Sequence, residues 1–64
     1  MKRQKLLNQL RKHGCDVVGE GAKHTRVLNR ANGQRSVVPL HREIGPGLVR
    51  EICEQLDVPI PSEK

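Results

Sequence analysis

Residues 23–40 read KHTRVLNRANGQRSVVPL, two β-prone segments separated by an Asn-Gly pair. Asn-Gly between such segments is the strongest short-range signal for a β-hairpin, because both residues tolerate the backbone dihedrals of a tight turn. The sequence therefore predicts strands at about 23–30 and 35–40, joined by this turn. Pairing around the turn would place Arg35 opposite Arg30, and like charges in that position repel each other unless an anion lies nearby.

Outside the hairpin, the pattern predicts one more strand and two helices. Two adjacent valines favour a strand at about 15–20, which the glycines of the following turn end. An amphipathic helix is expected at about 2–13, where leucines recur at helical spacing and a glycine follows the last turn. A second helix is expected at about 46–56, with a proline in its first turn. The remainder, 58–64, is expected to be an extended tail.

This order predicts an α+β fold, a two-layer sandwich in which both helices cover one face of a three-stranded antiparallel sheet. The 64 residues make one domain, and a domain this small buries only about 60% of the surface that its unfolded chain exposes. Because the chain has no Phe, Tyr or Trp, its core must be aliphatic. The residues expected in the core are Leu6, Leu7, Leu10, Val17, Val18, Val27, Leu28, Val37, Val38, Leu40, Ile44, Leu48, Val49, Ile52 and Leu56.

The charge of the chain is unevenly distributed. The net charge is +5, but residues 1–42 hold ten Lys or Arg against two acidic residues, whereas residues 43–64 hold two against five. A basic half favours an anionic partner, and nucleic acid is the commonest large polyanion in a cell. Without aromatic side chains the protein cannot stack bases, so any RNA must be held by charge, hydrogen bonds and shape.

The cysteines and the apolar residues bear on the compartment. Cys15 and Cys53 are far apart and too few for a disulfide framework, so they are expected to be reduced and half-buried in a cytoplasmic protein. No apolar run approaches the length of a membrane span, and no signal peptide is visible, so no membrane partner is expected. The histidine and cysteine spacings match no pair of zinc ligands. No metal and no small-molecule cofactor is therefore predicted.

His24 is the candidate for chemistry. Alternation along its strand places Thr25, Val27 and Asn29 toward the helices, and His24, Arg26 and Arg30 on the open face of the sheet with Leu28. Imidazole is the side chain best suited to move a proton near neutral pH. On the residues alone, His24 is either a catalytic group acting on RNA or a polar residue at the start of a strand. The cations Lys23 and Arg26 fit phosphate contacts and solvated charge equally well.

The other two histidines have simpler explanations. His13 ends the first helix, where a cation suits the negative end of the helix dipole. His41 is either a connector residue or an RNA contact. Two further functions therefore stay open from the residues: a module that binds RNA without cutting it, and a basic surface that docks an acidic protein.

Three motifs carry a resemblance to a known family over about residues 3–58. They are the helix followed by His13-Gly14-Cys15-Asp16-Val17, the histidine motif Gly21-Ala22-Lys23-His24-Thr25-Arg26-Val27, and the element Val38-Pro39-Leu40-His41-Arg42-Glu43-Ile44 ahead of Gly47-Leu48. In these motifs the chain resembles the HicA toxins of bacterial and archaeal toxin–antitoxin pairs. It departs from the family at Ala22 and Lys23, where glycine and serine are commonest, and at Leu40, where a basic residue often precedes the second histidine.

The resemblance implies a fold similar to a double-stranded-RNA-binding domain and the activity of a ribosome-independent mRNA interferase. It implies mRNA as substrate and a HicB antitoxin as partner, which is expected to cover His24 or to displace it. The family's catalytic histidine matches His24. The residues then expected to bind RNA are Lys23, Arg26, Arg30, Arg35, His41 and Arg42.

RNA carries its own nucleophile, so one well-placed base can begin cleavage without a metal. We expect His24 to take the proton of the 2′-hydroxyl, whose oxygen attacks the adjacent phosphorus and leaves a 2′,3′-cyclic phosphate and a 5′-hydroxyl. Lys23, Arg26, and Arg30 or Arg35 would offset the charge that grows on the phosphorane. The proton for the leaving group would come from His41 or from water.

Overall fold

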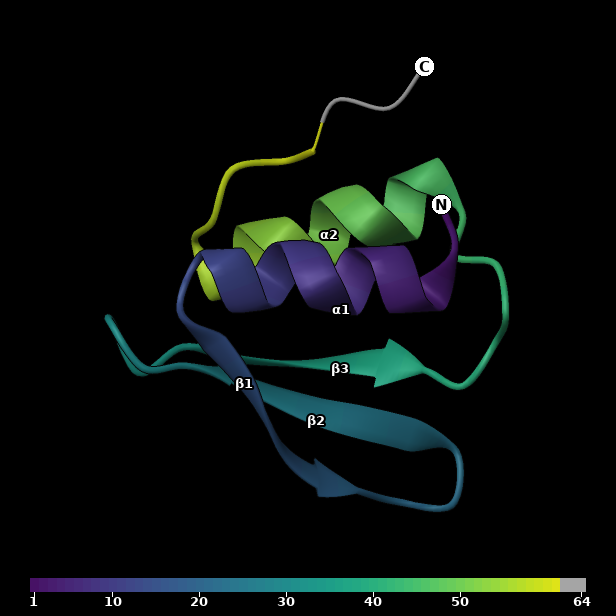
Figure 1. Cartoon of the computed structure of the whole chain (residues 1–64), viewed down its shortest axis with the longest axis horizontal. Coiled ribbons are helices and arrows are strands. Elements are labelled where there is room, and N and C mark those ends of the chain that lie inside the picture. Colours follow the sequence, from purple (N-terminus) through teal and green to yellow (C-terminus); the bar gives the residue numbers. More distant parts are fainter. Residues whose placement is uncertain (62–64) are drawn as a thin grey trace.

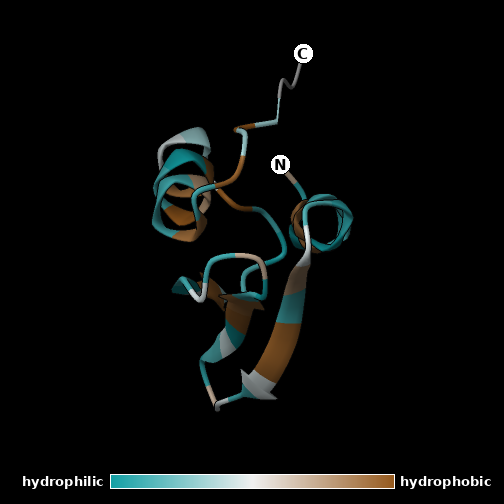
Figure 2. Ribbon diagram, turned by 90° about the vertical axis from the view of Figure 1, so that its left-hand side faces the viewer, coloured by the Kyte–Doolittle hydropathy of each residue, from teal (hydrophilic) through white to brown (hydrophobic). Residues whose placement is uncertain are grey.

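A computed structural model describes residues 1–61 and confirms the predicted α-β-β-β-α order (Figure 1). Within that range, three antiparallel strands form one sheet in the order β1-β2-β3. Both helices lie on the same side of the sheet and leave its other face open (Figures 1 and 2). The elements are α1 (Arg3–Lys12), β1 (Cys15–Glu20), β2 (His24–Asn29), β3 (Arg35–Pro39) and α2 (Pro46–Leu56).

The core lies between the two helices and the covered face of the sheet. The leucine stripe of α1 is buried as predicted, and every third or fourth residue of α2 packs against it. Burial of each such side chain contributes roughly 1.5–3 kcal/mol. The buried apolar residues are Leu6, Leu7, Leu10, Cys15, Val27, Val38, Ile44, Val49, Ile52, Cys53 and Leu56.

Five aliphatic residues expected in the core are exposed instead, namely Val17, Val18, Val37, Leu40 and Leu48. Alternation explains Val37, which lies between two buried neighbours and therefore points to the open face. A register shift between Val17 and Gly19 interrupts the alternation at Val18. Leu40 follows the end of β3, and Leu48 lies away from the buried stripe of α2. The core is thus smaller than the count of aliphatic residues suggests.

The β2–β3 turn is longer than the predicted Asn-Gly turn. The backbone N–H of Asn29 donates to the carbonyl of Gln34 at 2.8 Å, so four residues form the loop. Gly33 adopts a φ of 75°, the left-handed region that glycine enters without a steric penalty. This closure pairs Arg35 with Leu28, and the expected pairing of Arg35 with Arg30 is therefore wrong.

Two asparagine amides join this hairpin to the C-terminal end of α2. Asn29 Nδ2 donates to the carbonyl of Leu56 at 2.8 Å, and Asn32 Nδ2 donates to the same oxygen at 3.1 Å. Asn29 Oδ1 also accepts the N–H of Ala31 at 3.0 Å. The last carbonyls of a helix have no partner within the helix, so these contacts satisfy a group that burial would otherwise penalise.

Cys15 and Cys53 are free thiols, and both are completely buried rather than half-buried. Burial raises the pKa of the Cys15 thiol, and the neighbouring Asp16 carboxylate raises it further. Burial likewise raises the pKa of Cys53, with a smaller contribution from Cys15. Within residues 1–61, no helix is long and apolar enough to cross a membrane.

The Asn29 contacts give the first prediction. In Asn29→Ala, the Leu56 carbonyl keeps only Asn32 and the Ala31 N–H loses its acceptor, so the free energy of unfolding should fall by about 1–3 kcal/mol in a denaturant titration. Asn8→Ala removes an exposed amide from α1 and should change the free energy by less than about 0.5 kcal/mol. Equal losses in the two variants would contradict the role given to Asn29.

The raised thiol pKa values give a pH dependence. Above the ordinary thiol pKa of 9.0, the unfolded chain loses thiol protons that the folded chain keeps, so the folded state binds more protons and stability falls as pH rises. Between about pH 8 and pH 10, wild type should therefore lose stability more steeply than Cys53→Ala, which has one titrating thiol fewer. Parallel pH profiles would show that Cys53 ionises equally in both states.

Candidate functional site

His24 lies at the start of β2, where the sheet ends. It pairs with Pro39, the last residue of β3, which has no N–H to continue the ladder. On the other side, the N–H of Gly21 donates to the His24 carbonyl at 2.8 Å and closes the β1–β2 turn. The His24 side chain is exposed.

A hollow at this end of the sheet is lined by His24 and His41, and we call it the His24 hollow. It is lined by Ala22, Lys23, His24, Pro39, Leu40 and His41. The β1–β2 turn supplies one wall, and the connector after β3 supplies the other. The structure therefore brings His24 together with Lys23 and His41, three of the residues singled out from the sequence.

The face assignment of β2 follows the predicted alternation. Thr25, Val27 and Asn29 are buried beneath the helices, whereas His24 and Arg26 are exposed on the open face. Leu28, also on the open face, is partly covered. The two sets of side chains come from one strand, so the orientation of His24 is fixed by the burial of its neighbours.

Arg26 lies across the sheet from Gly19 and Val37. A Cβ atom at Gly19 would lie 3.4 Å from Arg26 Nε and 3.8 Å from its Cζ, so the guanidinium rests over bare backbone. Arg26 is two residues along the strand from His24, or about 7 Å at the usual rise per residue. It is the one arginine within β2.

Arg35 lies at the other end of the open face. It pairs with Leu28, four residues or about 13 Å along β2 from His24. Together with Arg26 it borders a second hollow, whose lining includes the exposed or partly exposed apolar side chains of Val18, Leu28 and Val37. We call this surface the open-face patch: it consists of Val18, Leu28 and Val37 together with Arg26 and Arg35, and each arginine is paired across β2 and β3 with one of the apolar residues.

Arg30 is separated from His24 as well. It lies in the β2–β3 loop, and its Nε contacts the carboxylate of Asp16 on β1. The Arg30 side chain is 65% exposed and that of Asp16 49%, so solvent screens this ion pair and it contributes little to stability. Arg30 and Arg35 thus lie farther along the sheet from His24 than Lys23 and Arg26 do.

Arg42 lies in the connector after β3, with an exposed side chain. It borders a shallow hollow together with Lys2, Arg3, Gln4 and Leu40. Leu40 also lines the His24 hollow, so the two hollows adjoin. Arg42 and Lys2 thus border a hollow that adjoins the one holding His24 and His41.

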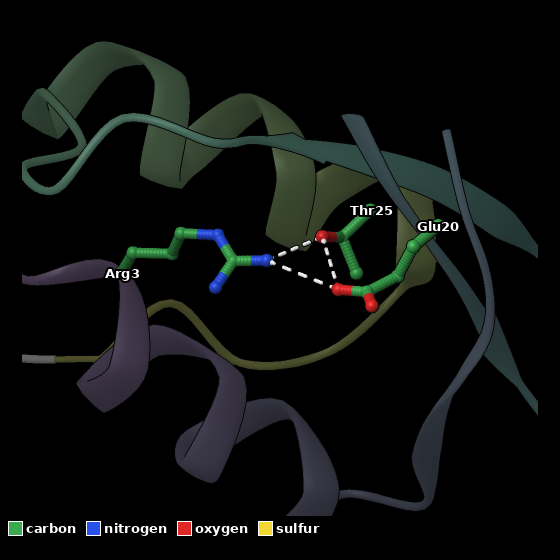
Figure 3. Close-up of polar contacts among 3 residues, drawn as sticks. All are labelled: Arg3, Glu20 and Thr25. Carbon is green, nitrogen blue, oxygen red and sulfur yellow. Dashed lines mark hydrogen bonds and ion pairs between the residues drawn. The ribbon is translucent and has the colours of Figure 1, made fainter. Parts of the chain in front are cut away.

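Sequence reasoning missed Arg3 and Glu20 (Figure 3). Arg3 lies in the first turn of α1. Its Nη2 donates to Thr25 Oγ1 and lies 3.8 Å from Glu20 Oε1. Thr25 Oγ1 in turn donates to Glu20 Oε1 at 3.5 Å. One signal was available, since a threonine on the buried face of β2 must find a partner for its hydroxyl. The partner itself is 22 residues away and has no local signature.

The titratable side chains of residues 1–61 do not gather into a metal site. Over the described residues, no group of three or more His, Cys, Asp or Glu side chains could hold a metal ion. The His24 hollow instead offers two imidazoles and a lysine. Such a set can transfer protons and bind an anion.

Comparison with known proteins adds one match. The family model described as the HicA toxin of bacterial toxin–antitoxin systems matches residues 3–58. No curated protein and no solved structure matches the chain. The match spans both helices, all three strands and every residue of the His24 hollow. The chain therefore belongs to the HicA family of toxins of bacterial toxin–antitoxin systems.

Proposed function

We propose that this toxin is a metal-independent endoribonuclease in which His24 is the catalytic base. The observation that carries the proposal is the His24 hollow, where an exposed imidazole adjoins a second imidazole and a lysine at the edge of a basic sheet face. Family membership supports an RNA target and a cognate antitoxin in general terms.

His24 takes the proton from a 2′-hydroxyl of the bound RNA. The freed oxygen attacks the adjacent phosphorus, and the bond from phosphorus to the 5′-oxygen breaks. The products are a 2′,3′-cyclic phosphate and a 5′-hydroxyl, whose proton comes from His41 or from water. General acid–base catalysis of this kind accelerates a reaction by about 10²–10⁴-fold.

Lys23 and Arg26 offset the negative charge that grows on the phosphorus in the transition state. They approach His24 from two sides, Lys23 from the β1–β2 turn and Arg26 from the open face. The more distant cations, Arg30, Arg35 and Arg42, contact the phosphates on either side of the cleaved bond. Such contacts hold the RNA without reading its bases.

A HicB antitoxin would neutralise the toxin by covering the His24 hollow.

The alternative functions are a non-catalytic RNA-binding module and a protein-interaction domain. The open-face patch favours the second of these, because exposed Val18 and Val37 suit a protein partner better than RNA.

The catalytic role of His24 is tested by RNA cleavage in the presence of EDTA. Wild type should cleave a defined RNA and leave a cyclic phosphate, whereas His24→Ala should be slower by about 10²–10⁴-fold. His13→Ala is the matched control, because His13 lies at the end of α1, where its ring contacts Gln9, and is not part of the His24 hollow. An undiminished rate in His24→Ala would refute the proposal, and loss of cleavage with EDTA would refute its metal independence.

The phosphate contact of Arg26 is tested by the salt dependence of binding, measured in the His24→Ala background so that the RNA stays intact. Each phosphate contact to a single strand contributes about 0.7 to the slope of log K against log salt, so Arg26→Gln should make the slope shallower by about that amount. Arg50→Gln removes an exposed arginine from α2 and should leave the slope unchanged. A flat profile for the parent protein would favour the protein-interaction domain.

A further inference from the structure

Among the arginines of residues 1–61, all but Arg3 are exposed, and only 21% of the Arg3 side chain is accessible to solvent. Its guanidinium reaches from α1 beneath the sheet to Thr25 and Glu20 (Figure 3). These two residues face each other in the β1–β2 register, directly on either side of the turn that carries Lys23. The side chain of Arg3 therefore holds both ends of the turn that leads into His24.

The backbone of Arg3 holds the other wall of the His24 hollow. Its N–H donates to the carbonyl of Arg42 at 2.9 Å, and the preceding residue, Lys2, forms a β-bridge with Glu43. Arg42 directly follows His41. A single residue at the start of α1 thus connects the segment that bears His24 with the segment that bears His41.

Packing alone does not explain an arginine at this position. Arg3 Nε is buried and has no hydrogen-bond partner among the described residues. Leaving a buried donor unpaired is unfavourable, and an apolar side chain of similar length would avoid this. The part of the guanidinium that is used is the end that reaches Thr25 and Glu20. The geometry of these contacts, and not burial of the stem, is what an arginine adds here.

We propose that Arg3 is a positioning residue that sets His24 and His41 relative to each other. It does not touch the RNA in this role: its side chain acts through Thr25 on the backbone of His24, while its backbone N–H, which any non-proline residue here would supply, holds the connector through Arg42. The inference rests on the proposed function of His24. Displacing a catalytic group by about 1 Å can cost about 10²-fold in rate, so modest loosening of either wall should be visible in catalysis.

The test compares Arg3→Met with Arg50→Met in the full chain. Arg3→Met keeps a long apolar stem and should lower kcat by about 10-fold to 10²-fold with KM nearly unchanged, because RNA contacts remain and only the alignment is lost. Arg50→Met makes the same charge change on the exposed face of α2 and should keep the wild-type kcat. Thr25→Val removes the acceptor of Arg3, and the double variant should be no slower than Arg3→Met, as expected for two residues that act as one unit.

A readout independent of activity separates positioning from a merely structural role. The ring resonances of His24 and His41 should shift in Arg3→Met and in Thr25→Val at a temperature where both are folded, while the His13 resonance stays in place. Arg3→Lys keeps the charge and should restore part of kcat. Should Arg3→Met fail to fold, the same measurements on Thr25→Val decide the question.

Unchanged histidine resonances together with a wild-type kcat in folded Arg3→Met or Thr25→Val would overturn the positioning role. Failure of the proposed function looks different. If His24→Ala cleaves RNA like wild type, His24 is not the base, whereas the histidine resonances still report whether Arg3 orders the hollow.

Discussion

The structure depends on the alternation of side chains along the central strand, β2. Its six residues supply both the covered face of the sheet and the candidate site, since Thr25, Val27 and Asn29 are buried while His24 and Arg26 are exposed. A slip of one residue would exchange the two sets, placing an imidazole and a guanidinium in an aliphatic core. The burial of Val27 and the exposure of His24 are therefore one constraint, and the core stabilises the orientation on which the chemistry would depend.

The local features could be read from the sequence because they depend on neighbouring residues. Periodicity alone indicates the leucine stripe of α1 and the two faces of β2, and the preference of proline for a first turn indicates where α2 begins. The hairpin register could not, because the dihedral preference of Asn32-Gly33 fits a four-residue loop as well as a tight turn. The partners of Arg3 and Arg30 were missed for another reason: ion pairs between distant segments have no periodic signature.

A chain without aromatic residues has little apolar surface to bury, and the structure uses polar contacts where a larger protein would use a thicker core. Asn29 and Asn32 join the hairpin to α2, while Arg3 joins α1 to β1 and β2. These contacts are directional, so they specify relative positions as well as adding stability. The same small core leaves Val18, Leu28 and Val37 uncovered or partly covered, so burial of the open-face patch by a partner would stabilise the fold.

The β2–β3 loop also bears on the chemical ageing of the protein. Asparagine before glycine is the pair most prone to deamidation, because the glycine nitrogen can attack the side-chain amide. Here the Gly33 N–H is engaged with the Asn29 carbonyl at 2.8 Å and the Asn32 amide with Leu56 at 3.1 Å, so both reacting groups are held. If the loop opened and Asn32 became a carboxylate, its negative charge would face the carbonyl end of α2, where the helix dipole disfavours it. Deamidation is irreversible, so molecules without the Asn32 amide would accumulate with time. In these molecules the hairpin would lack one of its contacts with the Leu56 carbonyl of α2.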